Sequence, residues 1–471
     1  MPDNDSAPIE PASPEREPTA GGAYAWYVVG VLMFAYIVAI VDRQILSLLV
    51  EPIKRDLGVS DTQIGLLAGF AFVVFYSILG VPIARLADRK NRKAIISIGI
   101  VIWSLMTAAC GLAKTYMQLF LMRVGVGVGE ATLSPAAYSI MADYFPPRKL
   151  ARAIGVYAMG LYAGSGLALL AGSAVVAMLS GPGMLDLPVI GEMRRWQMTF
   201  IVVAIPGFVV LALMMTVREP PRRQFAYDGS HKTVEAEAVP FSEIRDFFRD
   251  NRRLIVAHFG GFLMIGTVIS AFLIWVPEFL RRTYDYTIAE AGAIYGFALL
   301  IFGTAGPYFG GWFAEWLARR GYRDAEMRAA AICGAIMIPI SILAPLAPER
   351  ISGMVMVALL SFILASSQGL PPTIMQLIAP NRMRAQFTAL FMLVAVLAGF
   401  SLGPAFTAMI TDYVFGYEEA LPYSLAIVSA ALTPIGVALL VYGLKPYRER
   451  LAQQQAAIES AAKDDARAVQ A

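Results

Sequence analysis

Long apolar segments, each near the length that crosses a lipid bilayer, recur along almost the whole chain. The hydrocarbon core of a bilayer is about 30 Å thick, so a spanning helix needs about 20 mostly apolar residues. Backbone groups in hydrocarbon must be satisfied within the segment, which favours helices. The predicted spans are 24–48, 60–86, 93–113, 116–144, 149–180, 196–217, 253–281, 287–318, 327–347, 351–378, 383–412 and 420–444. The sequence therefore predicts an all-α integral membrane protein with twelve transmembrane helices in two pseudo-symmetric six-helix halves.

The composition agrees with a membrane protein, because only 15% of the residues are charged, whereas a soluble domain has about 25%. Residues 1–22 are polar and rich in proline, without the apolar run of a cleavable signal peptide. Cys110 and Cys333 lie far apart inside apolar segments, so we interpret them as core residues and not as a disulfide or a metal site. We expect the lipid bilayer as a partner, and neither a metal nor a nucleic acid.

The placement of lysine and arginine predicts that both chain termini lie in the cytoplasm. The cytoplasmic side then carries 28 of the 38 basic residues, the outside carries 8, and Arg43 and Arg123 lie within the membrane. The longest connection has the spacing of a short amphipathic helix on the cytoplasmic face, formed by Phe241, Ile244, Arg245, Phe247, Phe248, Arg249 and Arg252. The predicted regions are a disordered cytoplasmic tail (1–22), an N-terminal half (23–217), a cytoplasmic linker (218–252), a C-terminal half (253–444) and a cytoplasmic tail (445–471).

Four charged residues are predicted at membrane depth, all of them in the N-terminal half. Such charges are rare, because a lone charge there costs about 3 kcal/mol or more. Arg123 and Glu130 are seven residues apart, so they share one helical face at a separation of about 10 Å. Asp42, beside Arg43 in the first span, lies at about the depth of Arg123. We interpret Asp42, Arg123 and Glu130 as a proton-coupling relay; the alternative is a static cluster of ion pairs.

The C-terminal half has no comparable charge at membrane depth. Its polar residues there are Thr267, Ser270, Ser366, Ser367, Gln368 and Thr373. This asymmetry predicts a substrate whose polar or anionic headgroup lies near the arginines and whose apolar part faces the C-terminal half. The predicted substrate-binding residues are Arg43, Arg123, Glu130, Ser134, Ser367 and Gln368. His258, near the start of its span, is interpreted as structural.

The loop after the second span carries the most specific motif, GVPIARLADRKNRK from Gly80 to Lys93. It resembles the hallmark of the major facilitator superfamily, Gly-x-Leu-Ala-Asp-Arg-x-Gly-Arg-Lys, with Ala84 and Asn91 in place of the two glycines. In that family the aspartate closes a cytoplasmic charge network, and a weak repeat, GGWFAEWLARRG from Gly310, puts a second acid at the matching position. The residues implied for this conformational latch are Asp88, Arg92, Asp143, Arg152 and Glu315. The alternative is that the basic residues only anchor the topology.

Two further stretches are similar to the Spinster-type branch of that superfamily, YIVAIVDRQ at 36–44 and RVGVGVGEATLSPAAYSIMADYFPPRKLAR at 123–152. The resemblance implies a secondary transporter that moves an amphipathic lipid, such as a sphingoid phosphate or a lysophospholipid, by alternating access, with a proton gradient and no cofactor. Similar openings in the anion:cation symporter branch leave an organic-anion or sugar-acid symporter as an alternative. A non-transporting sensor or scaffold is a third reading. No nucleophile–base pair stands out, so we do not expect an enzyme; we expect a functional monomer in the cytoplasmic (inner) membrane.

Overall fold

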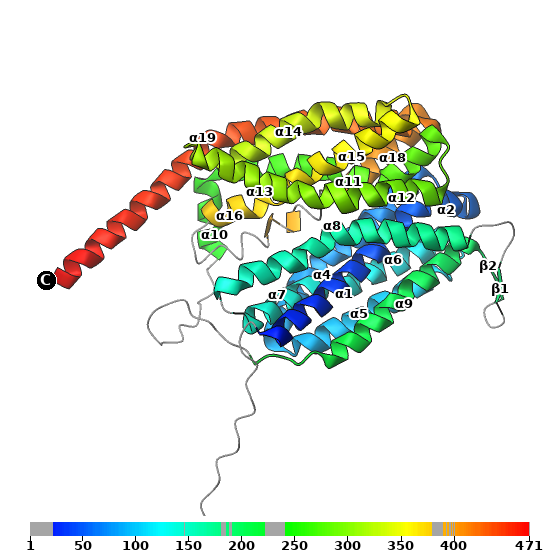
Figure 1. The fold of residues 1–471 in the computed structure, drawn as a ribbon, viewed down its shortest axis with the longest axis horizontal. Helices are drawn as coiled ribbons and strands as arrows, with labels where there is room; N and C mark the ends of the chain where they lie inside the picture. Colours follow the sequence, from blue (N-terminus) through cyan, green and yellow to red (C-terminus); the bar gives the residue numbers. More distant parts are fainter. Residues whose placement is uncertain are drawn as a thin grey trace, which may run out of the picture.

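Two bundles of helices lie one above the other, the N-terminal bundle below and the C-terminal bundle above (Figure 1). The computed structural model describes residues 22–145, 147–179, 185–187, 191–221, 241–378, 390–391, 393–394, 397, 399 and 401–470. The N-terminal bundle contains α1 (Ala23–Leu48), α2 (Val50–Leu57), α3 (Asp61–Ala68), α4 (Phe70–Arg89), α5 (Arg92–Cys110), α6 (Tyr116–Glu130), α7 (Leu133–Tyr144), α8 (Pro147–Met178), β1 (Leu185–Leu187), β2 (Gly191–Met193) and α9 (Arg195–Thr216).

The linker helix α10 (Phe241–Asp250) connects this bundle to the second one. The C-terminal bundle contains α11 (Arg252–Tyr284), α12 (Ile288–Ala298), η1 (Leu299–Gly303), α13 (Thr304–Arg319), α14 (Ala325–Leu343), η2 (Ala344–Leu346), α15 (Arg350–Ser366), α16 (Leu370–Ile378), α18 (Ser401–Met409), η5 (Ile410–Phe415), η6 (Glu418–Ala420) and α19 (Leu421–Gln470). Between the bundles, α8 packs against α12 and η1, α3 packs against α18, and α1 packs against α11.

Ten helical segments among the described residues are long and apolar enough to cross a membrane. Their bounds follow the predicted spans closely, as for the span predicted at 196–217, which is α9. The predicted spans 116–144 and 383–412 are not among the ten, because the first is divided between α6 and α7 and the second lies partly outside the described residues. The chain is a multi-pass membrane protein, and the prediction of twelve helices is consistent with this structure.

Three of the predicted spans are interrupted, so the prediction of one continuous helix is wrong there. Between α6 and α7 the hydrogen-bond ladder stops near Ala131, because Pro135 has no N–H to donate to that carbonyl. A turn at 367–369 separates α15 from α16, just before Pro371. Gly69 separates α3 from α4. At membrane depth such breaks are tolerated only where protein or a water-filled cavity satisfies the freed backbone groups.

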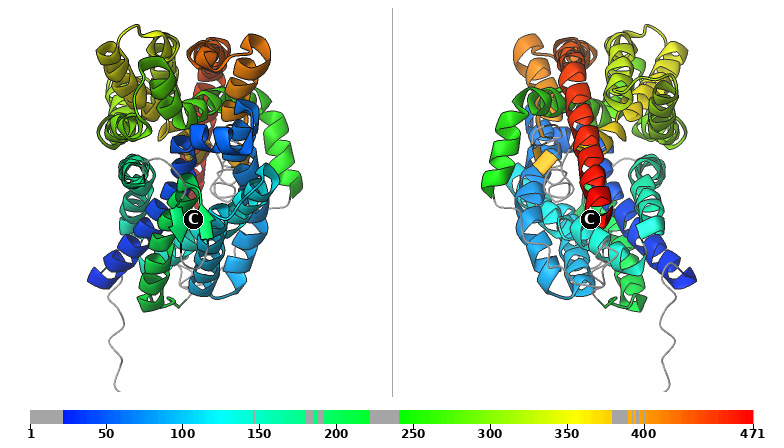
Figure 2. Two further views of the ribbon diagram at one scale, coloured as in Figure 1. Left: turned by 90° about the vertical axis from the view of Figure 1, so that its right-hand side faces the viewer. Right: turned by 90° about the vertical axis from the view of Figure 1, so that its left-hand side faces the viewer.

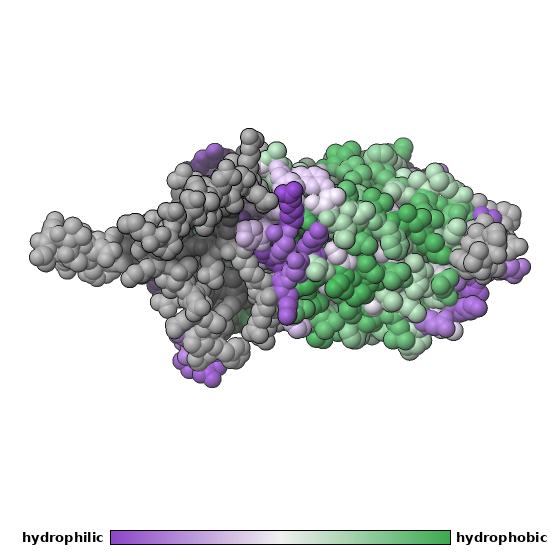
Figure 3. Space-filling model, turned by 90° about the horizontal axis from the view of Figure 1, so that it is seen from below, coloured by the Kyte–Doolittle hydropathy of each residue, from purple (hydrophilic) through white to green (hydrophobic). Residues whose placement is uncertain are grey.

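The side of the N-terminal bundle that faces away from the C-terminal bundle is apolar over its middle. Figure 3 shows hydrophobic residues across this middle part and hydrophilic residues toward both ends. Large apolar side chains are exposed there on α5 and α9, among them Ile98, Leu105 and Ile205. An apolar belt between two polar ends is the surface that a bilayer covers.

The two ends of the molecule carry different elements (Figure 1). One end, here called the α2 end, carries α2 and a hairpin of β1 and β2, in which Leu185 pairs with Met193; the sequence had not indicated this hairpin. The view from this end shows α2 lying between the two bundles (Figure 2, left). The opposite end, here called the α10 end, carries α10 and the last part of α19. The charge placement predicts that the α10 end faces the cytoplasm.

Helix α10 lies at the position predicted for an amphipathic helix. Its apolar face packs on the C-terminal bundle, where the ring of Phe248 meets Phe259 with centroids 5.9 Å apart. The guanidinium of Arg450 lies 5.0 Å from the ring centroid of Phe247. The side chains of Phe241 and Ile244 lie outside the described residues. Protein therefore covers at least part of the face that was expected to lie on the membrane surface.

Candidate functional site

The four charged residues predicted at membrane depth come from two helices. Asp42 and Arg43 lie near the C-terminal end of α1, and Arg123 and Glu130 lie on α6. Hydrogen bonds join the two helices at both levels. We call these four residues the charged cluster.

Arg43 and Glu130 form the ion pair of the charged cluster. Nε and Nη2 of Arg43 each lie 2.6 Å from Oε2 of Glu130. The Glu130 side chain is fully buried, whereas 25% of the Arg43 side chain is exposed. The relay hypothesis named Arg123 as the arginine that acts with Glu130. In this structure Arg43 has that position, so Glu130 depends on an arginine that is accessible from one side.

Arg123 binds the backbone of α1 instead. Its Nη1 donates a hydrogen bond of 2.9 Å to the carbonyl oxygen of Asp42, and the whole residue is buried. Within the described part of the chain, Nε of Arg123 has no hydrogen-bond partner. Arg123 therefore keeps a free donor inside the cluster.

Each acid of the charged cluster has one bound and one free oxygen. Oδ2 of Asp42 accepts a hydrogen bond of 3.1 Å from the hydroxyl of Thr107 on α5, and Oε2 of Glu130 is bound by Arg43. Among the described residues, nothing donates to Oδ1 of Asp42 or to Oε1 of Glu130. Buried polar atoms are normally satisfied, so these two oxygens mark places where a proton or a ligand group can bind.

Aromatic side chains surround the ion pair. The guanidinium of Arg43 lies 4.5 Å from the ring centroid of Phe72 and 5.0 Å from that of Tyr76, and both rings belong to α4. Helix α6 reaches α4 because Gly127 has no side chain, since a Cβ there would lie 2.5 Å from the carbonyl oxygen of Phe72. Cation–π contact stabilises a guanidinium in a partly desolvated place.

A second aromatic group lies beside Ser134, the hydroxyl predicted to bind substrate. Its Oγ is 3.2 Å from the hydroxyl of Tyr157, whose ring stacks on Tyr36 at 4.9 Å and meets Tyr138 edge-on at 5.4 Å. The sequence analysis missed these tyrosines and Thr107. They could have been found in the sequence as hydroxyl-bearing residues within the apolar spans that form the N-terminal half.

The structure does not bring the polar residues of the C-terminal half into the charged cluster. The hydroxyls of Ser366 and Ser367 donate to carbonyls of their own helix, those of Phe362 and Leu364. Gln368 lies in the turn that follows α15. His258 is buried, and its Nε2 lies 3.1 Å from the carbonyl oxygen of Pro371; this contact fits the structural role expected for it.

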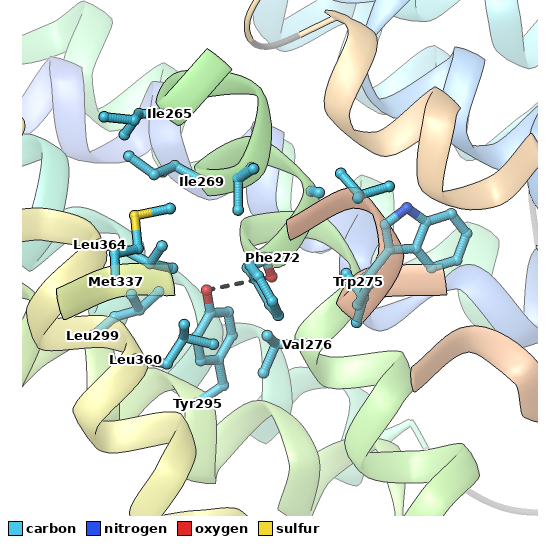
Figure 4. Close-up of a cluster of buried hydrophobic side chains, with 14 of the residues drawn as sticks. Ile265, Ile269, Phe272, Trp275, Val276, Tyr295, Leu299, Met337, Leu360 and Leu364 are labelled. Atoms are coloured by element: carbon cyan, nitrogen blue, oxygen red, sulfur yellow. Dashed lines mark hydrogen bonds between the residues drawn. The ribbon is translucent and has the colours of Figure 1, made fainter. Parts of the chain in front are cut away.

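The apolar part of the C-terminal half is well packed at this depth. Figure 4 shows Phe272, Trp275 and Tyr295 among aliphatic side chains from several helices. The Tyr295 hydroxyl donates to the Phe272 carbonyl at 3.4 Å, so even this polar atom is satisfied inside the bundle. These side chains form the buried core of the C-terminal bundle.

At the α10 end, Arg92 is the centre of the predicted latch. Its guanidinium contacts Asp143, lies 2.7 Å from Glu219, and donates to the carbonyl of Pro220 at 3.0 Å. All these partners belong to the N-terminal half or to the start of the linker. The side chains of Asp88 and Arg152 lie outside the described residues, and Glu315 is exposed on α13. The described part of the latch therefore does not join the two halves in this structure.

The α2 end has a network of ion pairs that the sequence analysis missed. Arg282 of the C-terminal half holds Asp61 of the N-terminal half with two hydrogen bonds of 2.6 and 2.9 Å. Lys54 lies 2.6 Å from Asp61 and also binds Glu418 across the interface. The members of this α2-end network are Glu51, Lys54, Asp61, Glu278, Arg281, Arg282 and Glu418.

Two membrane-embedded helical bundles, with ion pairs between them at the α2 end and buried charges within the N-terminal bundle, define a membrane transporter built from two halves. The sequence profile of the Major Facilitator Superfamily matches residues 32–404, and the chain belongs to this superfamily. It is a transporter of the Spinster type, as the resemblance of its motifs implied. The predicted all-α membrane fold of this superfamily is confirmed, and the count of twelve helices and the cytoplasmic termini stay predictions that agree with it.

Three relatives illustrate the similarity. An MFS-type efflux pump of Mycolicibacterium smegmatis is 28% identical over 453 residues, which cover 94% of this chain and 98% of the pump. A probable L-galactonate transporter of Escherichia coli is 26% identical over 309 residues, which cover 64% of each chain. The crystal structure of a bacterial homolog to the human lysosomal transporter Spinster, inward-facing and unoccupied, is 29% identical, covers 91% of this chain and 97% of its own, and superposes with a TM-score of 0.74.

Proposed function

We propose that this protein is a proton-coupled secondary active transporter that moves an amphipathic lipid, of the sphingoid phosphate or lysophospholipid type, by alternating access. It would work as a monomer in the cytoplasmic membrane, with the proton gradient in place of a cofactor. The observation that carries this proposal is the charged cluster, in which one half of the protein holds two buried acids, each with a free carboxylate oxygen, beside a buried and a partly exposed arginine. Ionisable groups at membrane depth mark substrate and proton pathways.

Proton coupling follows from the pairing within the cluster. Arginine stays protonated, so the groups that can change charge are the two carboxylates. A proton on Glu130 removes the charge that holds Arg43. The released guanidinium is partly exposed and can then bind an anionic headgroup, which links the proton to the substrate and to the conformation that each favours.

The amphipathic substrate follows from the asymmetry between the halves. The arginines of α1 and α6 and the aromatic rings of α4 suit a charged headgroup, whereas Ser366 and Ser367 of the C-terminal half bond within their own helix. A hydrocarbon tail gains about 0.8 kcal/mol for each methylene that it buries. This substrate class is the one that the resemblance of the motifs to the Spinster-type branch implies.

The ion pairs across the interface support an inward-facing conformation. The α2-end network joins the halves on the predicted outer side. On the predicted cytoplasmic side, the described contacts of Arg92 are with the N-terminal half and the start of the linker. We further propose that Asp88, Arg92, Asp143, Arg152 and Glu315 form the latch when the cytoplasmic side closes. Asp88→Asn should then raise the inward-facing population, and unchanged spin-label distances across the α10 end would count against the latch.

A proton-coupled symporter of organic anions or sugar acids is the second candidate. The two arginines of the charged cluster suit a carboxylate equally well, and one relative is named as a probable L-galactonate transporter. The two candidates differ in one respect: a lipid has a hydrocarbon tail that the C-terminal half would bind, and a sugar acid has none.

The deciding experiment measures flux into proteoliposomes that contain the purified protein. The panel comprises a lysophospholipid, a sphingoid phosphate and a sugar acid, each with and without an imposed proton gradient. Gradient-driven flux of either lipid supports the proposal, and flux of the sugar acid alone supports the second candidate. Flux of none of them would favour a non-transporting sensor.

A further inference from the structure

Thr107 makes an unusual hydrogen bond for a buried threonine of this protein. Most of the other buried threonines among the described residues donate to a carbonyl three or four residues earlier in the chain, as Thr132, Thr199, Thr267, Thr407 and Thr411 do. Thr411 also contacts a hydroxyl of another helix, that of Ser424, but not a carboxylate. A threonine hydroxyl has a single hydrogen to donate. Thr107, which is fully buried on α5, points it across to Oδ2 of Asp42 on α1 at 3.1 Å. The bond joins two helices at a carboxylate that has no other side-chain donor among the described residues.

The direction of this bond restricts where Asp42 can carry a proton. The protonated oxygen of a carboxylic acid is a weaker hydrogen-bond acceptor than the other oxygen, so a proton on Oδ2 would weaken the bond from Thr107. Oδ1 is buried and has no partner within the described part of the chain. The free position for a proton is therefore Oδ1. Without the bond, the carboxyl group could turn about its last torsion and exchange its two oxygens.

Other ionisable groups also act on Asp42. Arg123 and Glu130 face it from α6, Arg43 follows it on α1, and Cys110 lies near it at the end of α5. Arg123 contacts the Asp42 carbonyl and not its carboxylate. Thr107 is thus the described side chain that contacts the carboxylate directly.

We propose that Thr107 is a positioning residue for proton transfer, which holds Oδ2 of Asp42 so that Oδ1 accepts the proton. This inference rests on the proposed proton coupling, in which Asp42 carries a proton. Thr107 itself neither gains nor loses a proton in the step: an O–H bond of a hydronium ion breaks, an O–H bond forms at Oδ1, a water molecule is left, and the Thr107 hydroxyl remains a donor to Oδ2 throughout.

The test is an infrared difference titration of the purified full-length protein in lipid, which needs no substrate. Asp42→Asn identifies the carboxyl band of Asp42 as the band that disappears. Thr107→Val keeps the shape of the side chain and removes its donor. The Asp42 band should then move to higher frequency, because its carbonyl loses a hydrogen bond. The midpoint of its titration should rise by about one pH unit, because the lost bond stabilised the ionised form.

Two variants separate positioning from general damage. Thr107→Ser retains the hydroxyl and should restore both the frequency and the midpoint. Thr199→Val removes a buried hydroxyl of the same half that bonds only its own helix, and should leave both unchanged. An Asp42 band that is unaltered in Thr107→Val, or altered equally in Thr199→Val, would overturn the positioning role. If Asp42→Asn removes no titrating band, proton binding at Asp42 fails, and this inference fails with it.

Discussion

The charged cluster and the α2-end network both contain buried acids and bases, but the first lies within one half and the second is shared between the halves. Asp42, Arg43, Arg123 and Glu130 all belong to the N-terminal half. In the α2-end network the partners are shared, since Arg282 of one half holds Asp61 of the other. A cluster within one half can change its protonation or its ligand while the halves stay in place. A shared network must break when the halves separate at that end, so it stabilises only the conformation in which the α2 end is closed.

The largest expected effect comes from breaking the most buried shared pair. The side chains of Arg282 and Asp61 are 3% and 0% exposed. Arg282→Ala leaves Asp61 in the closed interface with Lys54 as its remaining cation, at a cost of about 3 kcal/mol. Since the open α2 end would not bear this cost, the ratio of open to closed should rise about 100-fold. Distances between spin labels at positions 55 and 417, on opposite halves, measure the change.

Arg281→Ala is the matched control, because Arg281 also pairs across the interface, with Glu51 at 3.1 Å. These side chains are 26% and 35% exposed, and a pair in partial contact with water contributes about 1 kcal/mol at most. The distances should therefore change by much less than in Arg282→Ala. Equal changes in both variants would show that burial does not determine the strength of the closure.

The next effect concerns the charged cluster, which lies within the N-terminal half. Glu130→Gln mimics the protonated acid, so Arg43 should lose its ionic partner permanently. Gradient-driven accumulation in proteoliposomes should fall about tenfold or more, whereas exchange without a gradient should persist, because the halves can still move. Glu243→Gln, on an exposed position of α10, is the control and should transport normally. If Glu130→Gln still accumulates substrate, the ion pair with Arg43 is only structural.

The arrangement of helices could be predicted from the sequence more fully than the partners of the charges. Apolar length defines a membrane span, so α9 was placed within one residue at either end. The breaks near Ala131 and at 367–369 were missed, because hydropathy does not register a lost backbone hydrogen bond. The short hairpin of β1 and β2 was missed because each strand has only three residues.

The same limit explains what was missed in the candidate site. A rise of about 1.5 Å per residue gives the depth of a side chain in the membrane, and it placed Asp42 and Arg123 at one level. It does not give the rotation of one helix relative to another. The choice of Arg43 as the partner of Glu130 therefore required the structure. Lys54, Asp61 and Arg282 were not recognised because their contacts connect loops and helix ends that are far apart in sequence.

A smaller effect is expected from the length of the hydrocarbon chain of the substrate, which tests the different roles of the two halves. If a hydrocarbon tail lies against the C-terminal half, each added methylene should strengthen competition about fourfold, which corresponds to about 0.8 kcal/mol. A series of lysophospholipids with one headgroup and increasing chain length measures this, below the concentration at which each forms micelles. Competition that is independent of chain length would favour the organic-anion symporter.

The smallest effect concerns the polar residues of the C-terminal half. The Ser367 hydroxyl lies 3.5 Å from the carbonyl oxygen of Leu364 on its own helix, so Ser367→Ala removes no contact between the halves and should change lysophospholipid flux by about twofold at most. Ser134→Ala, in the half that owns the charges, removes a contact of 3.2 Å with Tyr157 and should lower the same flux about threefold. The two side chains are the same size, and Ser367 is buried whereas Ser134 is half-buried. The difference in flux between the two variants therefore compares a serine of the C-terminal half with one of the N-terminal half. A tenfold loss in Ser367→Ala would show that the C-terminal half also binds the headgroup once the halves close around it, and that the predicted pairing of Ser367 with the substrate is correct.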